Sequence, residues 1–426
     1  MNAARNSALI RWTASKKRSS TLLTRFYSTL FRFRTFFGAI LIILSLLLTR
    51  LPNAPTITMQ QLPTNSPEVI PLVEGAVLKT TSTDPSFQIW LYPPKTDIIS
   101  EKIIQKGLYE PEEIEFAYIV VATCAATSTG DNNDSAGWAV DIGANIGFHT
   151  IYMAEIGMNV IAFEPATDTA GLLQKSIAAN GFENGKSNND NTYRNHPTVH
   201  VVRAAAGERN GFGRLVRHKG SAGMTVLQPY SDHDSDDNDK AQEHAQNGAV
   251  SNAHPLLPFG VEMVVGDNIP IVRPEDILQE RLPTTGTTIQ KQRNNHLWLV
   301  KFDAEGRKLH ALKGLNLEKF PFSFLAFEFF PELLQRAGGT DPLELLLFVA
   351  SYGYVCSTKP SSLRLLLDDN NNNDKATNTA KQGKGRVASL LETTDDFREW
   401  YEKHAAPLHK KYNGYHINLY CKRTGD

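Results

Sequence analysis

The sequence predicts an α/β fold in which helices wind around a mostly parallel sheet. Short apolar runs alternate with segments whose apolar residues recur at helical spacing, and many of the connections between them are short. A glycine-bearing turn, "DIGANIG" (141–147), joins the first of these runs to the helical segment that follows. Turns at the carboxyl ends of parallel strands are where such sheets bind ligands, so the pattern also predicts the place of a ligand site.

The expected elements can be placed in order along the chain. An upstream segment, 98–118, has helical spacing that is interrupted at Gly107 and Pro111. The remaining expected elements are strand 138–142, helix 148–156, strand 160–163, helix 168–179, strand 199–204, strand 297–302, helix 307–315, strand 322–330, helix 342–353, strand 354–358 and strand 415–423.

The chain is expected to hold one globular body behind an N-terminal region of different composition. The parts of that region are a basic tail or targeting segment over 1–34, an apolar segment over 35–50 and a Pro- and Thr-rich stalk over 51–95. The body is expected over 96–426, with flexible polar inserts near 183–197, 230–254 and 368–386.

Charge is distributed unevenly along the sequence. Nine of the 44 basic residues precede Glu68, the first acidic residue, which leaves 35 basic against 45 acidic residues in the whole chain beyond them. A body with this acidic excess is a poor candidate for binding nucleic acid, which requires basic residues clustered on one face. Three cysteines are too few and too scattered for a disulfide framework or a zinc site.

The apolar segment is predicted to be a membrane signal-anchor. Fifteen uncharged residues separate Arg34 from Arg50, and as a helix they would be roughly 22 Å long, shorter than the hydrocarbon core. Because the basic side is N-terminal, a retained anchor would be single-pass type II, with the body in the ER or Golgi lumen. Cleavable targeting to an organelle is the alternative, since residues 1–34 are rich in Arg and Ser.

The loop at 141–147 is suited to a cationic nucleoside ligand. Gly143 permits a tight turn, and Gly147 lets the next helix start close to the strand. Seventeen residues after Gly147 the second strand ends in Glu164, which is placed to accept hydrogen bonds from ribose hydroxyls. Asp141 would repel a pyrophosphate and attract an ammonium or sulfonium group. Together with Asn145, these residues predict a site for S-adenosylmethionine rather than for a nicotinamide dinucleotide.

The same segments resemble a known family. "VDIGANIGFHTIYMAEIGMNVIAFEP", "DIISEKIIQKGLYEPEEI", "LVKFDAEGRKLHALKGL" and "FLAFEFFPELL" are similar to successive motifs of the FkbM-type methyltransferases, a class I group that uses S-adenosylmethionine. The resemblance covers about 96–421 and implies a Rossmann-like, three-layer α/β/α fold with an antiparallel last strand. It also implies O-methylation of a sugar, glycan or small molecule. Lys308 departs from the pattern, because the family usually has a glutamate there.

A second group of polar residues follows the strand 297–302. Asp303 comes directly after that strand, so it is expected at the same edge of the sheet as the glycine loop. It is the candidate general base, with a helix N-cap as its alternative role. Glu305 is interpreted as a residue that stabilises the first turn of the next helix. His149 and Glu328 are further catalytic candidates. Lys301, within an apolar strand, is expected to pair with a carboxylate. A divalent cation held by Asp303, Glu305 and Glu328 is a further alternative, although no ligand spacing predicts a metal site.

The sequence thus predicts an S-adenosylmethionine-dependent methyltransferase. A nicotinamide-dependent oxidoreductase on the same sheet, and a non-catalytic descendant that binds a nucleoside or a partner, are the alternatives. The oligomeric state stays open. The central expectation is structural, namely that Asp141 and Glu164 face one shared cavity.

Overall fold

The computed structural model describes nine stretches of the chain. They are residues 73–127, 137–182, 197–218, 221, 223–230, 262–282, 297–363, 390–412 and 414–424. By its internal contacts the chain divides into Met1–Thr64 and Asn65–Asp426, and every described residue belongs to the second unit. The predicted tail and anchor lie outside the described residues, as do almost all of the three predicted inserts. Within the described stretches, no helix is both long enough and apolar enough to cross a membrane.

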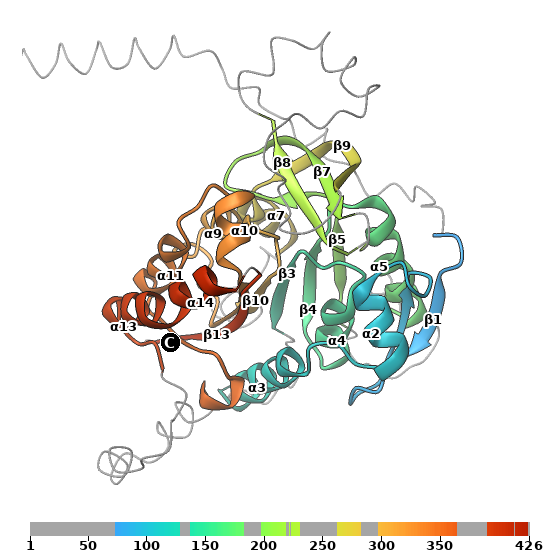
Figure 1. Cartoon of the computed structure of the whole chain (residues 1–426). Coiled ribbons are helices and arrows are strands. Elements are labelled where there is room, and N and C mark those ends of the chain that lie inside the picture. Colours follow the sequence, from blue (N-terminus) through green and yellow to red (C-terminus); the bar gives the residue numbers. More distant parts are fainter. Residues whose placement is uncertain are drawn as a thin grey trace, which may run out of the picture. The chain divides into compact units, whose positions relative to one another are not determined.

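A seven-stranded sheet forms the centre of this unit, with the strand order β12-β13-β11-β10-β3-β4-β5 (Figure 1). Its strands are β3 (Trp138–Ile142), β4 (Asn159–Phe163), β5 (Val199–Val202), β10 (Leu297–Phe302), β11 (Phe324–Phe329), β12 (Tyr354–Ser357) and β13 (Ile417–Arg423). From β11 to β5 all neighbouring strands are parallel, whereas β13 is antiparallel to both of its neighbours. The predictions of a mostly parallel sheet and of an antiparallel last strand are confirmed.

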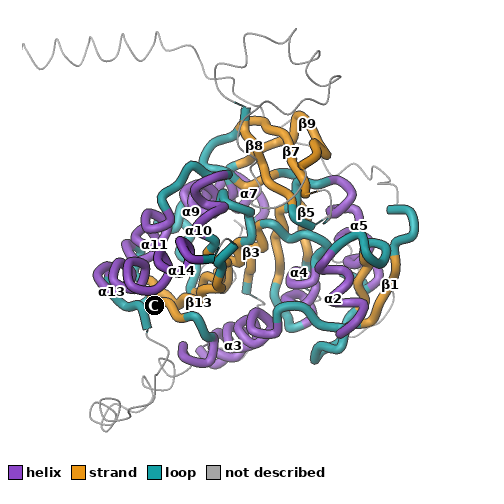
Figure 2. The backbone as a smooth tube through the Cα atoms, in the orientation of Figure 1, coloured by secondary structure: helices purple, strands orange, loops and turns teal. Residues whose placement is uncertain are grey.

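Helices connect and cover these strands (Figure 2). They are α2 (Ile98–Lys106), α3 (Pro111–Thr127), α4 (Phe148–Glu155), α5 (Thr167–Ala179), α7 (Pro274–Arg281), α9 (Lys308–Leu315), α10 (Pro331–Arg336), α11 (Pro342–Ser351), α13 (Thr394–Trp400), a π-helical turn η4 (Tyr401–Ala405) and α14 (Ala406–Lys411). Every residue of β3 and of β10 is buried. Because successive side chains of a strand point to opposite faces, the centre of the sheet is covered on both sides.

The upstream helical segment breaks where the sequence predicts. Gly107 ends α2 in the left-handed conformation, with φ 68°, and its N–H donates to the carbonyl of Ile103. Pro111 is the first residue of α3. Its missing N–H costs no hydrogen bond there, because the first N–H groups of a helix have no partner within the helix. Both helices then bring their apolar residues, such as Ile103 and Phe116, into the main core.

The start of ordered structure was predicted too late. Within the segment predicted to be a stalk, strands β1 (Val77–Thr80) and β2 (Gln88–Leu91) pair antiparallel with each other. β2 also docks on α5, since the N–H of Trp90 donates to Ser176 Oγ at 2.9 Å. Phe87, Ile89 and Leu91 are buried at alternate positions. Four-residue strands in a Pro- and Thr-rich stretch give too little periodicity to be recognised, and only the contact with α5 identifies them.

A second sheet, of four strands, was not predicted. Its order is β6-β9-β7-β8, and the strands are β6 (Ala205–Ala206), β7 (Gly211–His218), β8 (Thr225–Pro229) and β9 (Glu262–Val272). The register of β7 against β9 shifts twice, which breaks the alternation on which strand prediction depends. β7 also buries Arg217, whose charge is matched by Asp168 in α5 at 2.7 Å, a partner that lies 49 residues away.

A disulfide joins the two strands at one side of the large sheet. Cys356 in β12 and Cys421 in β13 are directly opposite each other in the register, and both are fully buried. This pair was not predicted, because its members are 65 residues apart and only the strand register brings them together. Cys124 in α3 is buried and is not in a disulfide.

Candidate functional site

The candidate site lies where the strand order of the large sheet changes direction. From β3 the chain proceeds outward to β4 and β5, and it then returns to β10 on the other side of β3. In open α/β sheets the crevice at such a point, outside the carboxyl ends of the strands, is where ligands bind. The glycine loop and the segment that begins at Asp303 meet at this point, where the N–H of Asp303 donates to the carbonyl of Ile142 at 2.7 Å. The structure therefore brings the glycine loop and the Asp303 segment side by side, as predicted.

Two glycines of the loop have positive φ and close neighbours, and at Gly147 the neighbour is α5 rather than the preceding strand that was predicted. Gly143 has φ 81°, and a Cβ on it would lie 2.3 Å from the carbonyl oxygen of Asp303. Gly147 has φ 91°, and a Cβ there would lie 2.2 Å from Leu173 Cδ1 in α5. Asn145, between them, is also left-handed, with φ 54°. The loop can adopt this conformation only because two side chains are absent.

Glu164 is held against the loop from the end of β4. One carboxylate oxygen accepts from the N–H of Asn145 at 2.8 Å, and the other accepts from the N–H of Ala166 at 2.9 Å. Burial raises the pKa of Glu164 to about 7, although these two hydrogen bonds act in the opposite direction. A carboxylate has about four lone-pair sites, so two remain for further donors.

Asp141 is fully buried at the end of β3. Thr150 Oγ1 in α4 donates to its Oδ2 at 2.6 Å, and Lys301 Nζ in β10 lies 3.9 Å from its Oδ1. Oδ1 accepts no hydrogen bond from any residue in the described stretches. Asp141 is thus a negative charge inside the wall of the site, in contact with residues of two neighbouring elements.

The expectation that Asp141 and Glu164 face one shared cavity is not met. The carboxylate of Glu164 points to the backbone of its own loop, and that of Asp141 points to Thr150 and Lys301. The pocket described below is lined by neither residue. The reason is that backbone N–H groups and a buried lysine compete for these carboxylates, a competition that spacing along the sequence does not show.

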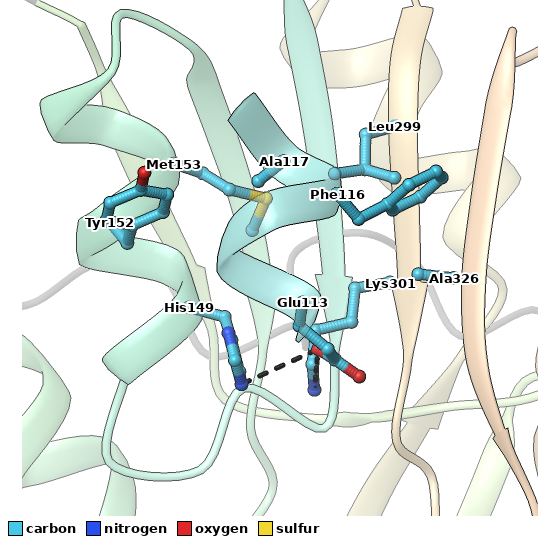
Figure 3. Close-up of a pocket in the computed structure, with 9 residues that line it drawn as sticks. All are labelled: Glu113, Phe116, Ala117, His149, Tyr152, Met153, Leu299, Lys301 and Ala326. Carbon is cyan, nitrogen blue, oxygen red and sulfur yellow. Dashed lines mark ion pairs between the residues drawn. The ribbon is translucent and has the colours of Figure 1, made fainter. Parts of the chain in front are cut away.

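Four residues form a cluster between α3, α4 and β10, here called the helix-side cluster: Glu110, Glu113, His149 and Lys301. His149 Nε2 lies 3.0 Å from Glu110 Oε2 and 3.5 Å from Glu113 Oε2. Lys301 Nζ lies 3.9 Å from Glu113 Oε2. Figure 3 shows His149 and Lys301 both pointing toward Glu113. The predicted pairing of Lys301 with a carboxylate is confirmed, although it has several partners.

The charges of the helix-side cluster control one another. Burial alone would raise the pKa of Glu110, but the hydrogen bond and charge of His149 lower it to about 2. Burial raises the pKa of Glu113 to about 7, against the attraction of Lys301 and His149. Burial would lower the pKa of His149, yet Glu113 and Glu110 raise it above its ordinary value. His149 is therefore an ion-pair partner in this arrangement.

A small, mostly apolar pocket lies directly beside this cluster (Figure 3). Its walls come from α3, α4, β10 and β11. Its polar lining consists of Glu113, His149, Tyr152 and Lys301, and the remaining lining residues are Phe116, Ala117, Met153, Leu299 and Ala326. The pocket places a cation and two acid–base groups against an apolar surface.

A second cluster lies at the carboxyl ends of β10 and β11 and is called the rim cluster: Asp303, Glu305, Glu328 and Lys308. Lys308 Nζ lies 3.7 Å from Asp303 Oδ1 and 3.6 Å from Glu328 Oε2. Asp303 Oδ2 also lies 3.7 Å from Lys301 Nζ, which links the two clusters. The side chains of Asp303 and Glu328 are 29% and 22% exposed, so a ligand could reach them.

Two alternative roles considered for these acids are excluded. Helix α9 has Arg307 as its N-cap residue, without a side-chain hydrogen bond, so Asp303 is not its cap. Glu305 precedes that cap, and the first turn of α9 contains no acidic residue, so the interpretation of Glu305 as a first-turn stabiliser is wrong. Burial, followed by the charges of Asp303 and Glu328, raises the pKa of Glu305 well above its ordinary value.

Each cluster contains three groups that could ligate a metal ion. The donor atoms of Glu110, Glu113 and His149 lie within 4.8 Å of one another, as do those of Asp303, Glu305 and Glu328. A buried lysine accompanies each set, however, and supplies positive charge near the position that an ion would take. The geometry alone therefore does not establish a metal site.

Two acids at the start of α3, Glu110 just before the helix and Glu113 within it, were not predicted as site residues. Glu110 and Glu113 were included in a helical segment, where acids near a helix start are usually explained by the helix dipole. A usable signal was the apolar remainder of the helix, "FAYIVVATCAAT". A helix this apolar is expected to pack against the sheet, which brings the acids at its start close to the sheet as well. Lys308 was noticed only as a departure from a family pattern, and its burial, at 1% exposure, was not foreseen.

Comparisons with known proteins give little for this chain. No family model matches it, and no curated protein matches it. Among solved structures, it is weakly similar to a SAM dependent methyltransferase from Agrobacterium tumefaciens, with a TM-score of 0.26 and 8% sequence identity. The match covers 59% of this chain and 52% of that one, so it spans about half of the other protein's length. A likeness of this strength carries no argument about activity.

Proposed function

We propose that this protein is an S-adenosylmethionine-dependent methyltransferase with a class I, FkbM-type fold that methylates a hydroxyl group of a sugar, glycan or small molecule. The observation that carries the proposal is the charge at the crevice between β3 and β10. Its acids are Asp141, Glu110, Glu113, Asp303, Glu305 and Glu328, and its bases are Lys301, Lys308 and His149. Six acidic side chains thus face three basic ones, and because burial raises the pKa of Glu113 to about 7 and that of Glu305 well above its ordinary value, the negative excess that remains is small.

This excess favours a ligand with positive charge. The proposed ligand has a sulfonium and an ammonium group, whereas the pyrophosphate of a nicotinamide dinucleotide would be repelled. Glu164, with lone pairs free beyond its two hydrogen bonds to the backbone, would accept from the ribose hydroxyls. Gly143, Asn145 and Gly147 would shape the loop around the ligand. Asp141 would act from within the wall, as a fixed negative charge.

The acceptor side is assigned to the rim cluster. When bound, S-adenosylmethionine would supply a methyl group on a cationic sulfur, and the sulfur would keep the electron pair of the C–S bond that breaks as the C–O bond forms. Asp303, partly exposed at the end of β10, would take the proton from the acceptor hydroxyl. Glu328 would orient the acceptor from the end of β11. His149 is paired with Glu110 and Glu113, so its role would be to hold the wall of the site in place and not to transfer the proton.

The first test is binding of S-adenosylhomocysteine, measured by calorimetry on the full chain against NAD as the competing ligand. Binding of the first and not of the second is expected, and the reverse result would refute the cofactor assignment. The second test compares glycans and metabolites of cells with and without the protein by mass spectrometry, looking for a gain of about 14 Da, the mass of one added CH₂ group.

The role of Asp303 is tested separately. We expect Asp303→Ala to lower methyl transfer about 10²–10⁴-fold while S-adenosylhomocysteine still binds, because a general base contributes on that order. Asp395→Ala, at an exposed position in α13, is the matched control and should leave transfer unchanged. Full activity of Asp303→Ala would show that another group takes the proton. Absence of transfer by the wild-type chain to any acceptor would favour the non-catalytic alternative.

We also propose that the body of the protein faces an oxidising lumen, behind an N-terminal membrane anchor. The buried disulfide Cys356–Cys421 supports this, since such bonds persist mainly in secretory compartments. The test is to trap thiols in intact cells with an alkylating agent and to map the peptides without reduction. Recovery of Cys356 and Cys421 as alkylated thiols would contradict the proposal. A fluorescent tag at the N-terminus would report whether the anchor is retained.

A further inference from the structure

Lys308 is an unusual residue in the rim cluster. It is 1% exposed, and its Nζ has no hydrogen-bond partner within the described part of the chain. The nearest carboxylates are those of Asp303 and Glu328, at 3.7 and 3.6 Å. These distances exceed the usual range for an N–H···O hydrogen bond, so the ammonium group is surrounded by acids without being bonded to them.

Local structure does not favour a cation at this position. Lys308 is the first residue of α9, where the helix dipole is unfavourable to positive charge. Taking an ammonium group out of water is also costly unless it is paired. Burial would lower the pKa of Lys308, but Glu328 and Asp303 raise it above its ordinary value. The carboxylates of the rim cluster are therefore what keeps this side chain charged and in place.

The arrangement matches a metal site in which an ammonium group replaces the ion. Asp303, Glu305 and Glu328 have donor atoms within 4.8 Å of one another, as ligands of a divalent cation would. Lys308 Nζ lies close to two of them. Positive charge at that point neutralises the acids and repels a second cation.

The same atoms leave hydrogen-bonding capacity for a ligand. An ammonium group has three N–H donors, and Glu305 Oε2 is a second buried atom with no partner among the described residues. A polar pair separated by more than about 3.5 Å can be bridged by one oxygen atom. A hydroxyl group both accepts and donates, so it could satisfy the lysine and a carboxylate at once.

We propose that Lys308 is the resident cation of the acceptor site: its ammonium group takes the place of a divalent metal ion among Asp303, Glu305 and Glu328 and donates a hydrogen bond to the oxygen of the acceptor hydroxyl. The acceptor is then a neutral alcohol, and its binding needs no metal. The part of this inference that concerns the acceptor rests on the proposed function. The part that concerns metal exclusion does not.

The experiment is a titration with Mn²⁺, followed by electron paramagnetic resonance, on the full chain and two variants. Lys308→Met removes the charge and keeps the length of the side chain. Lys313→Met, in the same helix, removes a partly exposed lysine that pairs with Glu344 and is the matched control. We expect Lys308→Met to bind Mn²⁺ at least about tenfold more tightly than the wild type, an increase equivalent to about 1.4 kcal/mol. The Lys313→Met variant should behave as the wild type.

Two results would overturn the proposal. One is Mn²⁺ binding by the wild-type chain that is lost in Asp303→Asn, which would show that the acids hold a metal despite the lysine. The other is a folded Lys308→Met chain that binds Mn²⁺ no better than the wild type. If Lys308→Met does not fold, the wild-type titration still decides, because absence of binding there supports the proposal and binding that Asp303→Asn removes contradicts it.

Transfer assays test the acceptor part. A chelator should leave the wild-type rate unchanged, whereas Lys308→Met should lose about 10²-fold or more in transfer, since it lacks the donor to the acceptor oxygen. Lys308→Arg, which keeps the charge, should recover part of the rate. Loss of wild-type activity in the chelator would overturn the inference. Failure of the chain to bind S-adenosylhomocysteine would instead count against the proposed function and leave the Mn²⁺ result valid.

Discussion

The helix-side cluster and the rim cluster are built from the same kinds of residue but differ in how their charges are satisfied. In the helix-side cluster, His149 is within hydrogen-bonding distance of Glu110, at 3.0 Å, and close to Glu113. In the rim cluster, the lysine lies 3.6–3.7 Å from its acids, and both Lys308 Nζ and Glu305 Oε2 are buried without a partner among the described residues. Among the described residues, no buried side-chain atom of the first cluster lacks a hydrogen-bond partner, whereas two such atoms of the second cluster do.

This difference indicates a structural role for the helix-side cluster and a ligand-binding role for the rim cluster. A buried polar group that has its partner stabilises one conformation, whereas one without a partner costs free energy until something else binds it. The helix-side cluster fixes α3 and α4 against β10 and so shapes the crevice. The rim cluster keeps a buried donor and a buried acceptor unsatisfied beside Asp303 and Glu328, whose partly exposed side chains a ligand can reach. Changes to the first should affect mainly stability, and changes to the second mainly ligand binding.

The largest effect is expected from removing the lysine that links the two clusters. Lys301→Met leaves Asp141 buried without a cation and leaves Glu113 with His149 alone, and breaking a buried ion pair from one side typically costs about 3–5 kcal/mol. Urea unfolding measures the loss. Lys313→Met is the control, because its ion pair with Glu344 is partly exposed and should contribute at most about 1 kcal/mol. Equal losses in the two variants would contradict a structural role for the helix-side cluster.

A smaller loss of stability is expected from Gly143→Ala, a change in the glycine loop that affects the rim cluster through Asp303. The added Cβ would lie 2.3 Å from the carbonyl of Asp303, and φ is 81°, so the variant should lose about 2–4 kcal/mol and displace Asp303. Gly181→Ala is the control, with a similar φ of 77° and no atom within 4 Å of the added Cβ; it should lose about 1–2 kcal/mol. Thermal unfolding compares the pair. If both variants lose the same amount, the contact between the loop and Asp303 is not tight.

The smallest effect concerns the pH dependence of the helix-side cluster. The pKa of Glu113 is about 7 in the folded chain, above the ordinary value of a glutamate, so the folded state holds this proton more tightly than the unfolded state does. Stability should therefore fall as pH rises from about 4.5 through 7. Between pH 5 and pH 8 we expect the wild type to lose about 1–3 kcal/mol more than Glu113→Gln. Unfolding free energies at the two pH values test this, and parallel losses would be evidence against it.

The sequence predicted the large sheet well, because the features that define it are local. The strand that ends at Ile142 and the strand that ends at Phe302 are apolar except for Asp141 and Lys301, and glycines or polar residues mark their ends. The second sheet and the strand pair before α2 escaped prediction. Their strands are short or irregular in register, and they are stabilised by partners such as Asp168 and Ser176 that lie far away in the sequence.

Within the site, the sequence located the motifs but not the direction of their side chains. Asp303 was expected beside the glycine loop and lies there, since both segments follow neighbouring parallel strands. Asp141 and Glu164 were expected to face a common cavity, and each instead contacts groups of the protein itself. Choosing among competing partners requires distances, and a one-dimensional pattern contains none.

The sequence by itself determined the alternation of strands and helices, the glycine loop and the position of Asp303 after a buried strand, because each depends on residues close together in the chain. Only the tertiary structure decided that Glu110 and Glu113, at the start of α3, belong to the site, that Cys356 meets Cys421, and that a buried lysine lies among the rim acids. The physical reason is that burial and charge pairing are properties of neighbours in space. Helix packing and strand register bring those neighbours together from distant parts of the chain.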